Sequence, residues 1–342
     1  MIPVVDGHND ALLRVWRSGG SLREREEAGH LDLPRMREGG IAAGFFAIFV
    51  PAQDEDVVDP RTLVVRTADG HEVPLQPPLP LERAARIADE IAAIAERDLF
   101  LVRTLADLER CIAGEEVGAI LHFEGAEPIA PGLGNLDAWY ARGLRSLGLV
   151  WSRPNAFAEG VPFRIPSTPD TGPGLTAAGR RLVRECNRLR IVLDLAHLNE
   201  RGFRDVAALT DAPLVVTHSG AHAVCPHSRN LLDSQLDLIR DSGGVVGVVF
   251  DVPMTSPDGT RDPATPLDVL VRHVDHLAGR MGIEHVALGS DFDGAMMPDA
   301  LGDAAGLPRL LDALERAGYR GDDLAALAHG NWLRVLRATW GA

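Results

Sequence analysis

The chain has 342 residues, and 46% of them are hydrophobic, which supports a sizeable core and argues against a disordered or fibrous protein. Its formal net charge of −15 argues against a nucleic-acid partner, whose phosphates would be repelled. The sequence contains no uninterrupted apolar segment of about 20 residues and no signal-peptide pattern, so we expect no membrane partner. Three cysteines without paired spacing indicate reduced thiols and a cytoplasmic location: Cys111, Cys186 and Cys225.

Short apolar, β-branched runs recur along the chain. Eight of them predict strands: Ile2–Asp6, Ile41–Val50, Val117–Phe123, Leu144–Trp151, Ile191–Leu195, Leu214–Thr217, Val245–Phe250 and His285–Gly289. Amphipathic segments between them predict helices: Leu81–Ala95, Leu175–Leu189, Pro266–Met281 and Ala305–Ala317. Alternating strands and helices imply a parallel sheet, and eight repeats suggest closure into a (β/α)8 TIM barrel. We therefore expect an α/β fold with a single domain over residues 1–342.

Two segments depart from this alternation. Pro51–Pro80 is rich in Asp, Pro and alternating Val and Thr, and it predicts a loop or hairpin inserted after the second strand. Arg153–Gly174 contains five prolines and three glycines and predicts a long loop after the fourth strand. Long loops at this end of a barrel commonly shape the substrate pocket. The terminal stretch Asp322–Trp340 predicts a last helix that includes Gly330.

The first strand is followed by a histidine and a carboxylate two residues apart, His8 and Asp10. In an extended segment, residues i and i+2 point the same way, so both side chains can face one divalent metal ion. A single His-x-Asp arises often by chance, and a solvated turn explains it equally well. Its weight therefore depends on the other strand ends.

Four further strands also finish in ligand-type side chains: Glu124, His197, His218 and Asp291. A lone histidine in such a place is usually a core residue, and a lone aspartate usually caps the next helix. Those alternatives would have to hold independently at five strand ends, at the edge where barrel enzymes place their chemistry. Three imidazoles and three carboxylates exceed the needs of one tetrahedral zinc. They suit two metal ions about 3.5–4 Å apart, bridged by a carboxylate and a water.

Several motifs together resemble the membrane (renal) dipeptidase family, metallopeptidase family M19 of the amidohydrolase superfamily. They run in order through nearly the whole chain: Asp6-Gly7-His8-Asn9-Asp10, His30-Leu31-Asp32-Leu33-Pro34-Arg35-Met36, Glu124-Gly125, Asp194-Leu195-Ala196-His197, Thr217-His218-Ser219, Ser228-Arg229-Asn230, Ser290-Asp291-Phe292-Asp293-Gly294 and Gly330-Asn331-Trp332-Leu333-Arg334-Val335. The resemblance implies two zinc ions and a homodimer. It implies that one ion is held by His8, Asp10 and Asp291, the other by His197 and His218, with Glu124 as the bridge.

The resemblance also implies that Arg229 pairs with the carboxylate of a dipeptide, because an arginine fork suits a carboxylate bidentately. Without the resemblance, a surface arginine is the better interpretation. Two positions depart from the family pattern. Trp151 stands where family members carry a histidine, and an indole N–H donates a hydrogen bond but carries no charge. Arg153 is a candidate to supply a cation instead. Asp251 follows Phe250 where an aromatic pair is expected, and its carboxylate would repel acidic substrates or attract a free amine.

The resulting hypothesis is a binuclear zinc dipeptidase that acts through a metal-bridging hydroxide on small dipeptides. Asp291 would accept the water's proton and pass it to the leaving amine, and Trp151 or Arg153 would help to hold the oxyanion. The same ligands also accept Mn²⁺, Co²⁺ or Fe²⁺. One alternative is an amidohydrolase-type enzyme for another small amide, a lactone or an amine substrate. A second alternative is a non-catalytic metal- or peptide-binding protein.

Overall fold

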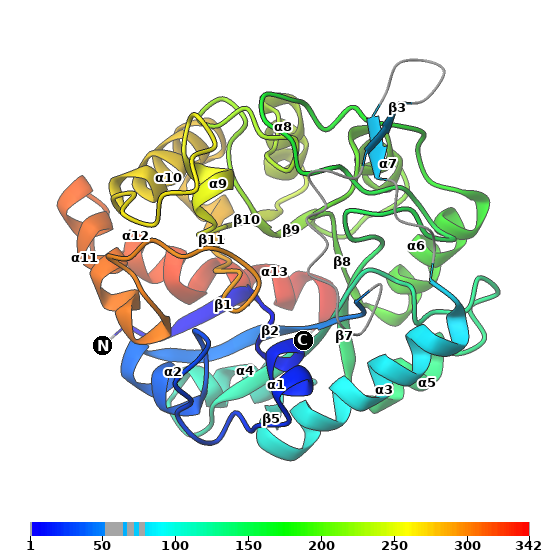
Figure 1. Cartoon of the computed structure of the whole chain (residues 1–342), viewed down its shortest axis with the longest axis horizontal. Coiled ribbons are helices and arrows are strands. Elements are labelled where there is room, and N and C mark those ends of the chain that lie inside the picture. Colours follow the sequence, from blue (N-terminus) through cyan, green and yellow to red (C-terminus); the bar gives the residue numbers. More distant parts are fainter. Residues whose placement is uncertain (1, 52–63, 67–71, 75–78, 342) are drawn as a thin grey trace.

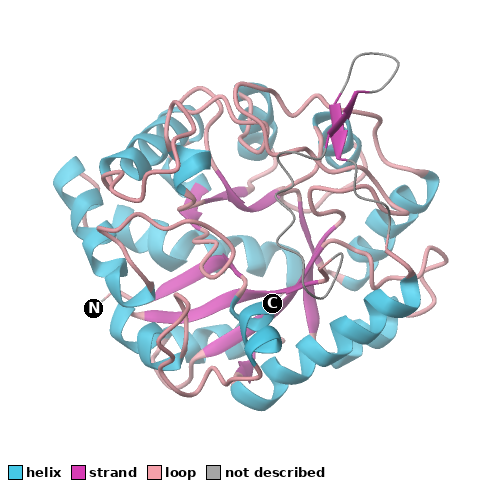
Figure 2. Cartoon of the chain, viewed as in Figure 1, coloured by secondary structure: helices cyan, strands magenta, loops and turns pink. Residues whose placement is uncertain are grey.

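The computed structural model describes residues 2–51, 64–66, 72–74 and 79–341. Eight parallel strands form a nearly closed barrel with helices around it (Figures 1 and 2). In spatial order these strands are β1 (Val4–Asn9), β2 (Ile41–Phe49), β6 (Gly118–Glu124), β7 (Leu144–Gly148), β8 (Val192–Asp194), β9 (Val215–Ser219), β10 (Val245–Val248) and β11 (Val286–Leu288). All eight predicted strands are present, and the prediction of an α/β TIM barrel is confirmed.

The extent of strand pairing differs around the barrel. β2 and β6 share a seven-residue parallel register, whereas β8 and β9 pair at one position. The gap between β1 and β11 is closed by an isolated parallel bridge, Asn9 to Phe292. Asp6 of β1 reinforces this closure by accepting hydrogen bonds from the backbone N–H and the hydroxyl of Ser290, at 2.8 and 2.9 Å. A short extra strand, β5 (Phe100–Leu101), pairs with the start of β6.

Helices cover the outside of the barrel. Their bounds are α1 (Ala11–Ser18), α2 (Leu33–Gly39), α3 (Leu81–Asp98), α4 (Leu105–Ile112), α5 (Leu136–Arg142), α6 (Ala177–Leu189), α7 (Glu200–Ala207), α8 (Asp233–Asp241), α9 (Val252–Thr255), α10 (Asp268–Met281), α11 (Leu307–Ala317), α12 (Asp322–Ala325) and α13 (Asn331–Trp340). In α3, residues 84, 87, 88, 91, 92 and 95 are buried, which is the spacing of one helical face. The four predicted helices correspond to α3, α6, α10 and α11.

The predicted terminal helix is divided into three parts. α12 passes through a π-helical turn, Ala326–Gly330, before α13 begins at Asn331. The Asn331 side chain donates to the carbonyls of Ile283 and Val286, at 2.8 and 2.7 Å. A π turn widens the helix locally, and this anchoring of Asn331 fixes where α13 starts.

α13 closes the amino end of the barrel, where Figure 1 shows it in red behind the strands. The barrel interior is one apolar cluster made of alternate strand residues and side chains of α13: Val5, Phe45, Ile120, Val192, Val215, Val245, Ala287, Trp332, Val335 and Leu336. Trp332 is fully buried, and its indole N–H donates to the carbonyl of Leu288 at 3.1 Å. Because this end is filled, the opposite end remains for polar side chains.

Within the predicted insertion after β2, the described residues form an antiparallel hairpin, β3 (Val64–Arg66) and β4 (Glu72–Pro74). The rest of that insertion lies outside the described residues. Residues 149–176, all of them described, contain no helix and no strand beyond an isolated bridge at Gly160. Among the described helices, none is long and apolar enough to cross a bilayer. The division into one domain over residues 1–342 stays a prediction.

Three glycines, in β1, in β10 and directly after β11, converge on one backbone carbonyl in the barrel interior. A Cβ added to Gly7, Gly247 or Gly289 would lie 2.5, 2.0 or 1.9 Å from the Thr217 oxygen. A side chain at any of these three positions would therefore push the neighbouring strands away from β9. The residue after Thr217 in β9 is His218, a predicted ligand. Glycine at these positions lets β1, β10 and β11 approach β9 below the site.

We predict that Gly289→Ala lowers the free energy of unfolding by about 2 kcal/mol or more, because overpacking in a filled core is costly. Gly279→Ala is the matched control, since Gly279 is exposed in α10 with nothing within 4 Å of the added methyl group. This control is expected to raise stability by about 0.5–1 kcal/mol through helix propensity. Urea unfolding measures both. Equal stabilities of the two variants would contradict this account of the barrel interior.

Candidate metal centre

The six predicted ligands meet at the carboxyl end of the barrel. His8 belongs to β1, Glu124 ends β6 and His218 belongs to β9, while Asp10, His197 and Asp291 lie just after β1, β8 and β11. All are buried except Asp291, which is half-buried. Side chains from five separate strands are thus brought together as the sequence predicts.

The ligand atoms form two overlapping groups that share His8. His8, Asp10 and Asp291 make up one group, and His8, Glu124 and His218 the other, and within each group the ligand atoms lie within 4.8 Å of one another. His8 Nε2 is 3.7 Å from Asp10 Oδ2 and 3.7 Å from Glu124 Oε1. Among the described residues, neither ring nitrogen of this fully buried imidazole has a hydrogen-bond partner. An orphaned buried nitrogen that faces carboxylates is what a cation ligand requires.

His197 joins the second group from the loop after β8. Its Nε2 lies 2.9 Å from Glu124 Oε1 and 3.1 Å from His218 Nε2. The hydroxyl of Ser152 lies 2.8 Å from His197 Nδ1, so the other edge of the ring is held in place. Two imidazole nitrogens therefore converge on a carboxylate oxygen.

The tautomer of His218 follows from its partners. The Thr217 hydroxyl lies 2.7 Å from Asp194 Oδ2 and 2.9 Å from His218 Nδ1. Because Asp194 accepts the single hydroxyl proton, the hydroxyl oxygen must accept from His218 Nδ1–H. The lone pair of His218 then lies on Nε2 and faces the carboxylate. Such a carboxylate–hydroxyl–imidazole chain orients a metal-binding histidine.

Burial dominates the electrostatics of the centre. It lowers the pKa of His197 and of His218 well below the ordinary value, and the positive charges of Arg229 and His8 act in the same direction. Both imidazoles are therefore neutral, as metal ligands must be. Burial raises the pKa of Glu124, and the charge of Asp10 raises it further.

His8 behaves in the opposite way. Burial lowers its pKa, but the charge of Glu124 and the contact with Asp10 outweigh burial and raise the pKa to about 10. Burial also raises the pKa of Asp291 to about 8, although His8 lowers it. Without a cation, this cluster therefore retains protons to balance its carboxylates. The cluster offers three imidazole and three carboxylate ligands, and the ring nitrogens of His8 have no hydrogen-bond partner among the described residues. This donor set fits divalent cations, which would replace those protons.

Backbone geometry places two of the ligands. His197 and Asp291 have φ angles of 64° and 63°, in the left-handed region that non-glycine residues rarely adopt. Strained residues of this kind persist where the surrounding structure holds them, often at functional sites. A Cβ at Gly294 would lie 2.1 Å from Asp10 Oδ2 and 2.6 Å from Asp291 Oδ1. Glycine there lets the loop after β11 close over the carboxylates.

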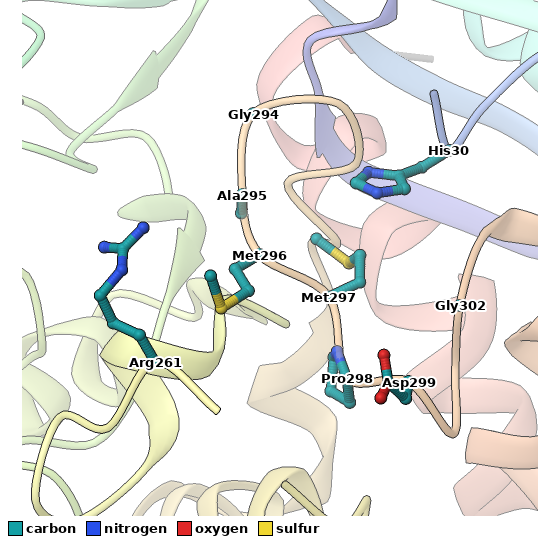
Figure 3. Close-up of a pocket in the computed structure, with 9 residues that line it drawn as sticks. All are labelled: His30, Arg261, Gly294, Ala295, Met296, Met297, Pro298, Asp299 and Gly302. Carbon is teal, nitrogen blue, oxygen red and sulfur yellow. The ribbon is translucent and has the colours of Figure 1, made fainter. Parts of the chain in front are cut away.

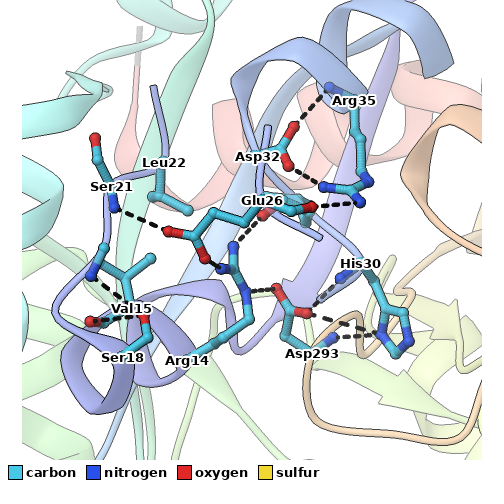
Figure 4. Close-up of polar contacts among 12 residues, drawn as sticks. Arg14, Val15, Ser18, Ser21, Leu22, Glu26, His30, Asp32, Arg35 and Asp293 are labelled. Atoms are coloured by element: carbon cyan, nitrogen blue, oxygen red, sulfur yellow. Dashed lines mark hydrogen bonds and ion pairs between the residues drawn. The ribbon is translucent and has the colours of Figure 1, made fainter. Parts of the chain in front are cut away.

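Asp293 ties this loop to α1 and to the segment between α1 and α2. Its Oδ2 accepts from Arg14 Nε at 3.1 Å, and its backbone N–H donates to His30 Nδ1 at 3.0 Å (Figure 4). Arg14 also pairs with Glu26. His30, which the family motif includes, therefore supports the loops next to Asp10 and Asp291.

Arg229 lies beside the imidazoles. It is buried, its Nη2 donates to the backbone carbonyl of His218 at 3.3 Å, and its Nε has no partner among the described residues. Burial lowers the pKa of Arg229 to about 10, partly offset by Asp291 and Glu124. The guanidinium therefore stays charged at neutral pH and has an unused donor.

Trp151 and Arg153 occupy different depths. Trp151 is half-buried, with its ring centroid 5.9 Å from that of His197. Arg153 is fully buried, and it donates through Nε to Glu127 Oε1 at 2.7 Å and through Nη2 to the Val50 carbonyl at 2.6 Å. The charge of Arg153 is thus neutralised by Glu127, and the guanidinium lies deeper in the protein than the ring of Trp151.

Asp251 immediately precedes α9, and its Oδ1 accepts from the backbone N–H of Met296 at 3.0 Å. It therefore braces the segment that follows Gly294. That segment borders a pocket of about 510 Å³, lined by His30, Arg261, Gly294, Ala295, Met296, Met297, Pro298, Asp299 and Gly302. Figure 3 shows Arg261 and His30 on opposite sides of residues 294–298. Because Gly294 leaves no room for a Cβ beside two carboxylates of the centre, this pocket adjoins the cluster.

Several residues have supporting roles that the sequence alone does not indicate. Ser152 and Thr217 each hold an imidazole, Asp194 orients Thr217, and Glu127 neutralises Arg153. Thr217 and Ser152 stand next to singled-out residues, which is a weak local signal. Glu127 has no local signal, because its partner is 26 positions away.

Comparisons with known proteins agree with this geometry. Residues 1–340 match the family model described as "Membrane dipeptidase (Peptidase family M19)". The chain belongs to the membrane dipeptidase family. The resemblance drawn from the sequence is thereby confirmed, as is the prediction of a metal-dependent hydrolase that acts on peptide bonds.

Individual relatives cover most of the chain. A metallopeptidase from Rhodobacter sphaeroides, solved with a phosphinate mimic of the dipeptide L-Ala-D-Ala, is 47% identical, with 99% of each chain covered and a TM-score of 0.93. An uncharacterized protein of Klebsiella pneumoniae, from the pqqA 5′ region, is 48% identical over 254 residues, which are 74% of this chain and 94% of that protein. The dipeptidase verJ of Clonostachys rogersoniana is 29% identical over 349 residues, covering 98% of this chain and 84% of that protein.

The raised pKa values predict how stability depends on pH once a chelator has removed cations. His8 and Asp291 bind protons more tightly in the folded chain, with pKa values of about 10 and 8. Stability that is present at pH 6.5 should therefore be lost as pH rises toward 8. The lowered pKa values of His197 and His218 affect stability only below about pH 6.5, the ordinary pKa of histidine, and therefore not in this pH range.

Urea unfolding of chelator-treated protein at pH 6.5 and 8 measures this loss. Saturation with zinc should abolish or reverse the trend, because the cation replaces the protons. Asp291→Asn should weaken it in the chelated protein. An identical pH dependence with and without chelator would contradict this description of the cluster.

Proposed function

We propose that this protein is a binuclear zinc dipeptidase that hydrolyses the peptide bond of small dipeptides. The observation that carries the proposal is the convergence of three imidazoles and three carboxylates at the carboxyl end of the barrel, in a chain that belongs to a dipeptidase family. One tetrahedral zinc cannot use six such ligands. Two adjacent cations can, and the pair of groups that share His8 supports that arrangement.

The ligands divide between the two ions by position. We assign His8, Asp10 and Asp291 to one ion, His197 and His218 to the other, and Glu124 to both. The 2.9–3.8 Å separations of Glu124 Oε1 from the three imidazoles support its bridging role. When bound, such cations supply Lewis acidity toward a carbonyl oxygen and lower the pKa of the attacking water. The same donors also suit Mn²⁺, Co²⁺ or Fe²⁺.

Asp291 is the proposed proton carrier. It is the half-buried member of the cluster, so it faces the side from which substrate and water arrive. A carboxylate oxygen of Asp291 would accept the proton of the attacking water and deliver it to the nitrogen of the leaving amine. Gly294 allows the chain to pass this carboxylate closely without covering it with a side chain.

Arg229 is the proposed anchor for the carboxylate of the dipeptide. Its buried guanidinium lies next to His218 and has an unpartnered Nε, and a desolvated Arg–carboxylate pair is both strong and directional. The negative charge of Asp251 raises the pKa of both Arg229 and Asp291, so Asp251 lies in the same region as these two residues. We assign to its carboxylate the attraction of the free amine of the substrate.

Trp151 is the proposed donor to the scissile carbonyl. Its half-buried ring lies next to His197, with the two ring centroids 5.9 Å apart, and its indole N–H is a hydrogen-bond donor. Donation to the carbonyl oxygen would stabilise the charge that develops there. Arg153, buried and paired with Glu127, would act by fixing Trp151 rather than by touching substrate.

The uncharged indole at this position favours one alternative, an amidohydrolase-type hydrolase of another small amide, a lactone or an amine substrate. A zinc-loaded protein that turns over such compounds but no dipeptide would support it. Zinc binding without turnover of either class would support a non-catalytic metal- or peptide-binding protein. The cytoplasmic location and the homodimer stay predictions.

Asp291→Asn should abolish turnover of dipeptides, with a loss of at least about 100-fold in kcat, because an amide cannot accept the proton. Metal content by elemental analysis should fall only in part, since five ligands remain. Asp312→Asn, which alters an exposed carboxylate of α11 outside the cluster, is the matched control. A wild-type kcat in Asp291→Asn would rule out the proton-carrier role.

Arg229→Ala should raise KM for L-Ala-D-Ala and L-Ala-L-Ala by about 100-fold or more, because the buried charged hydrogen bond to the carboxylate is lost. Dipeptide amides, which carry no terminal carboxylate, should show no such change. Arg229→Lys should restore only part of the affinity, because an ammonium lacks the fork. A KM effect of equal size on the amides would show that Arg229 does not read the carboxylate.

A further inference from the structure

Three half-buried aromatic side chains lie side by side next to the metal centre. Phe49 ends β2, while Trp151 and Phe163 belong to the segment between β7 and α6. The ring centroids of Phe49 and Trp151 are 5.0 Å apart, and those of Trp151 and Phe163 are 5.9 Å apart. We call these three residues the aromatic wall.

The aromatic wall directly contacts one of the candidate ligands. Trp151 and Phe163 each have a ring centroid 5.9 Å from that of His197. His197 Nε2 in turn lies 2.9 Å from Glu124 Oε1. A substrate bound at the cluster therefore has the aromatic wall as its neighbour on this side.

A buried ion pair supports the aromatic wall from behind. The Arg153 guanidinium carbon lies 5.2 Å from the Phe49 ring centroid and 5.6 Å from that of Trp151. Arg153 has no exposed surface, and its Nε donates to Glu127 Oε1 at 2.7 Å. The positive charge is thus neutralised and sealed off, so the wall offers substrate an apolar surface rather than a cation.

Exposed apolar surface is scarce elsewhere in the described part of the chain. Leu81 is its one exposed large hydrophobic residue, at 38%. Three partly exposed aromatic rings, with Trp151 in contact with the other two, next to the candidate metal centre therefore differ from an ordinary patch of surface. Ligand sites are commonly lined by aromatic side chains with a few polar groups.

The far end of the aromatic wall approaches Arg229. The ring centroid of Phe163 lies 6.0 Å from that of His227, and His227 Nδ1 accepts the backbone N–H of Arg229 at 3.2 Å. The Arg229 guanidinium reaches the same region, because its Nη2 donates to the carbonyl of His218, whose ring centroid lies 5.1 Å from that of His197. In the C-terminal residue of a dipeptide, the carboxylate and the side chain leave the same Cα. A carboxylate held by Arg229 therefore places that side chain within reach of Phe163 and Trp151.

We propose that the aromatic wall is a specificity subsite that binds an apolar side chain on the C-terminal residue of the dipeptide. The proposal rests on the proposed function, because Arg229 supplies the orientation. Leucine and phenylalanine side chains gain by leaving water against the rings. A charged side chain would lose hydration with no partner, because Arg153 is already paired with Glu127. The wall therefore selects for apolar residues and against acidic and basic ones.

The test is kcat/KM of the zinc-loaded full chain on Ala-Xaa dipeptides, with Xaa as Ala, Leu, Phe, Asp or Lys in both L and D forms. Leu-Ala and Phe-Ala form the reversed pair. Wild-type protein should prefer Ala-Leu and Ala-Phe to Ala-Ala, and Ala-Ala to Ala-Asp and Ala-Lys. Phe163→Ala should lower the Ala-Phe to Ala-Ala ratio by about 10- to 100-fold, chiefly through KM.

Two further variants separate the subsite from other roles. Trp151→Phe keeps a ring but removes the indole N–H, so kcat should fall on all substrates while the Ala-Phe preference remains. Phe100→Ala is the matched control, because Phe100 is half-buried in β5 at the opposite end of β6 from Glu124. It should keep the wild-type preference. If Phe163→Ala does not fold, Phe163→Leu should still show a smaller change in the same ratio.

The outcomes distinguish this proposal from the proposed function. If wild-type protein cleaves dipeptides but Phe163→Ala keeps the wild-type ratio, the subsite is disproved and the dipeptidase stands. The same holds if the change appears with Phe-Ala rather than Ala-Phe. If zinc-loaded wild-type protein cleaves no dipeptide at all, both proposals fail.

Discussion

Glu124 Oε1 lies 2.9 Å from the Nε2 of His197, 3.7 Å from that of His8 and 3.8 Å from that of His218. This carboxylate and its three imidazoles come from four strands, so their convergence depends on the closure of the barrel. The polar cluster is buried, and burial by itself disfavours charged side chains. The opposing charges and the hydrogen bonds to Ser152 and Thr217 hold the cluster together, and divalent cations would complete its neutralisation.

Much of this arrangement could be predicted from the sequence, because the relevant signals are local. A ligand-type residue at the end of an apolar run is visible without any tertiary information, and parallel strands bring such ends to one edge. His8 with Asp10 needed only a two-residue spacing. The eight strands were found for the same reason, since each is a short run that is buried on both faces.

The rest depends on contacts between distant positions. The pairing of Arg153 with Glu127 joins residues 26 positions apart, and Arg14 meets Asp293 across 279 positions. No spacing rule indicates either pair. The π turn before α13 was likewise missed, because it is determined by Asn331 bonding to carbonyls 45 and 48 positions away. The role of Trp151 could not be read locally either, since its neighbours Phe49 and Phe163 belong to separate segments.

The centre thus has two parts: the candidate ligands, which local sequence patterns predict, and the surrounding side chains, which they do not. The candidate ligands lie at strand ends, and we propose that they define the chemistry, while side chains of the adjoining loops define the substrate. The measurement that tests the central claim most directly is the zinc stoichiometry of wild-type protein and of Glu124→Gln, by elemental analysis together with activity on L-Ala-D-Ala. Two zinc ions per wild-type chain, and loss of both full occupancy and activity in Glu124→Gln, are predicted. A single zinc in the active wild-type protein, or two retained in an active Glu124→Gln, would contradict the account.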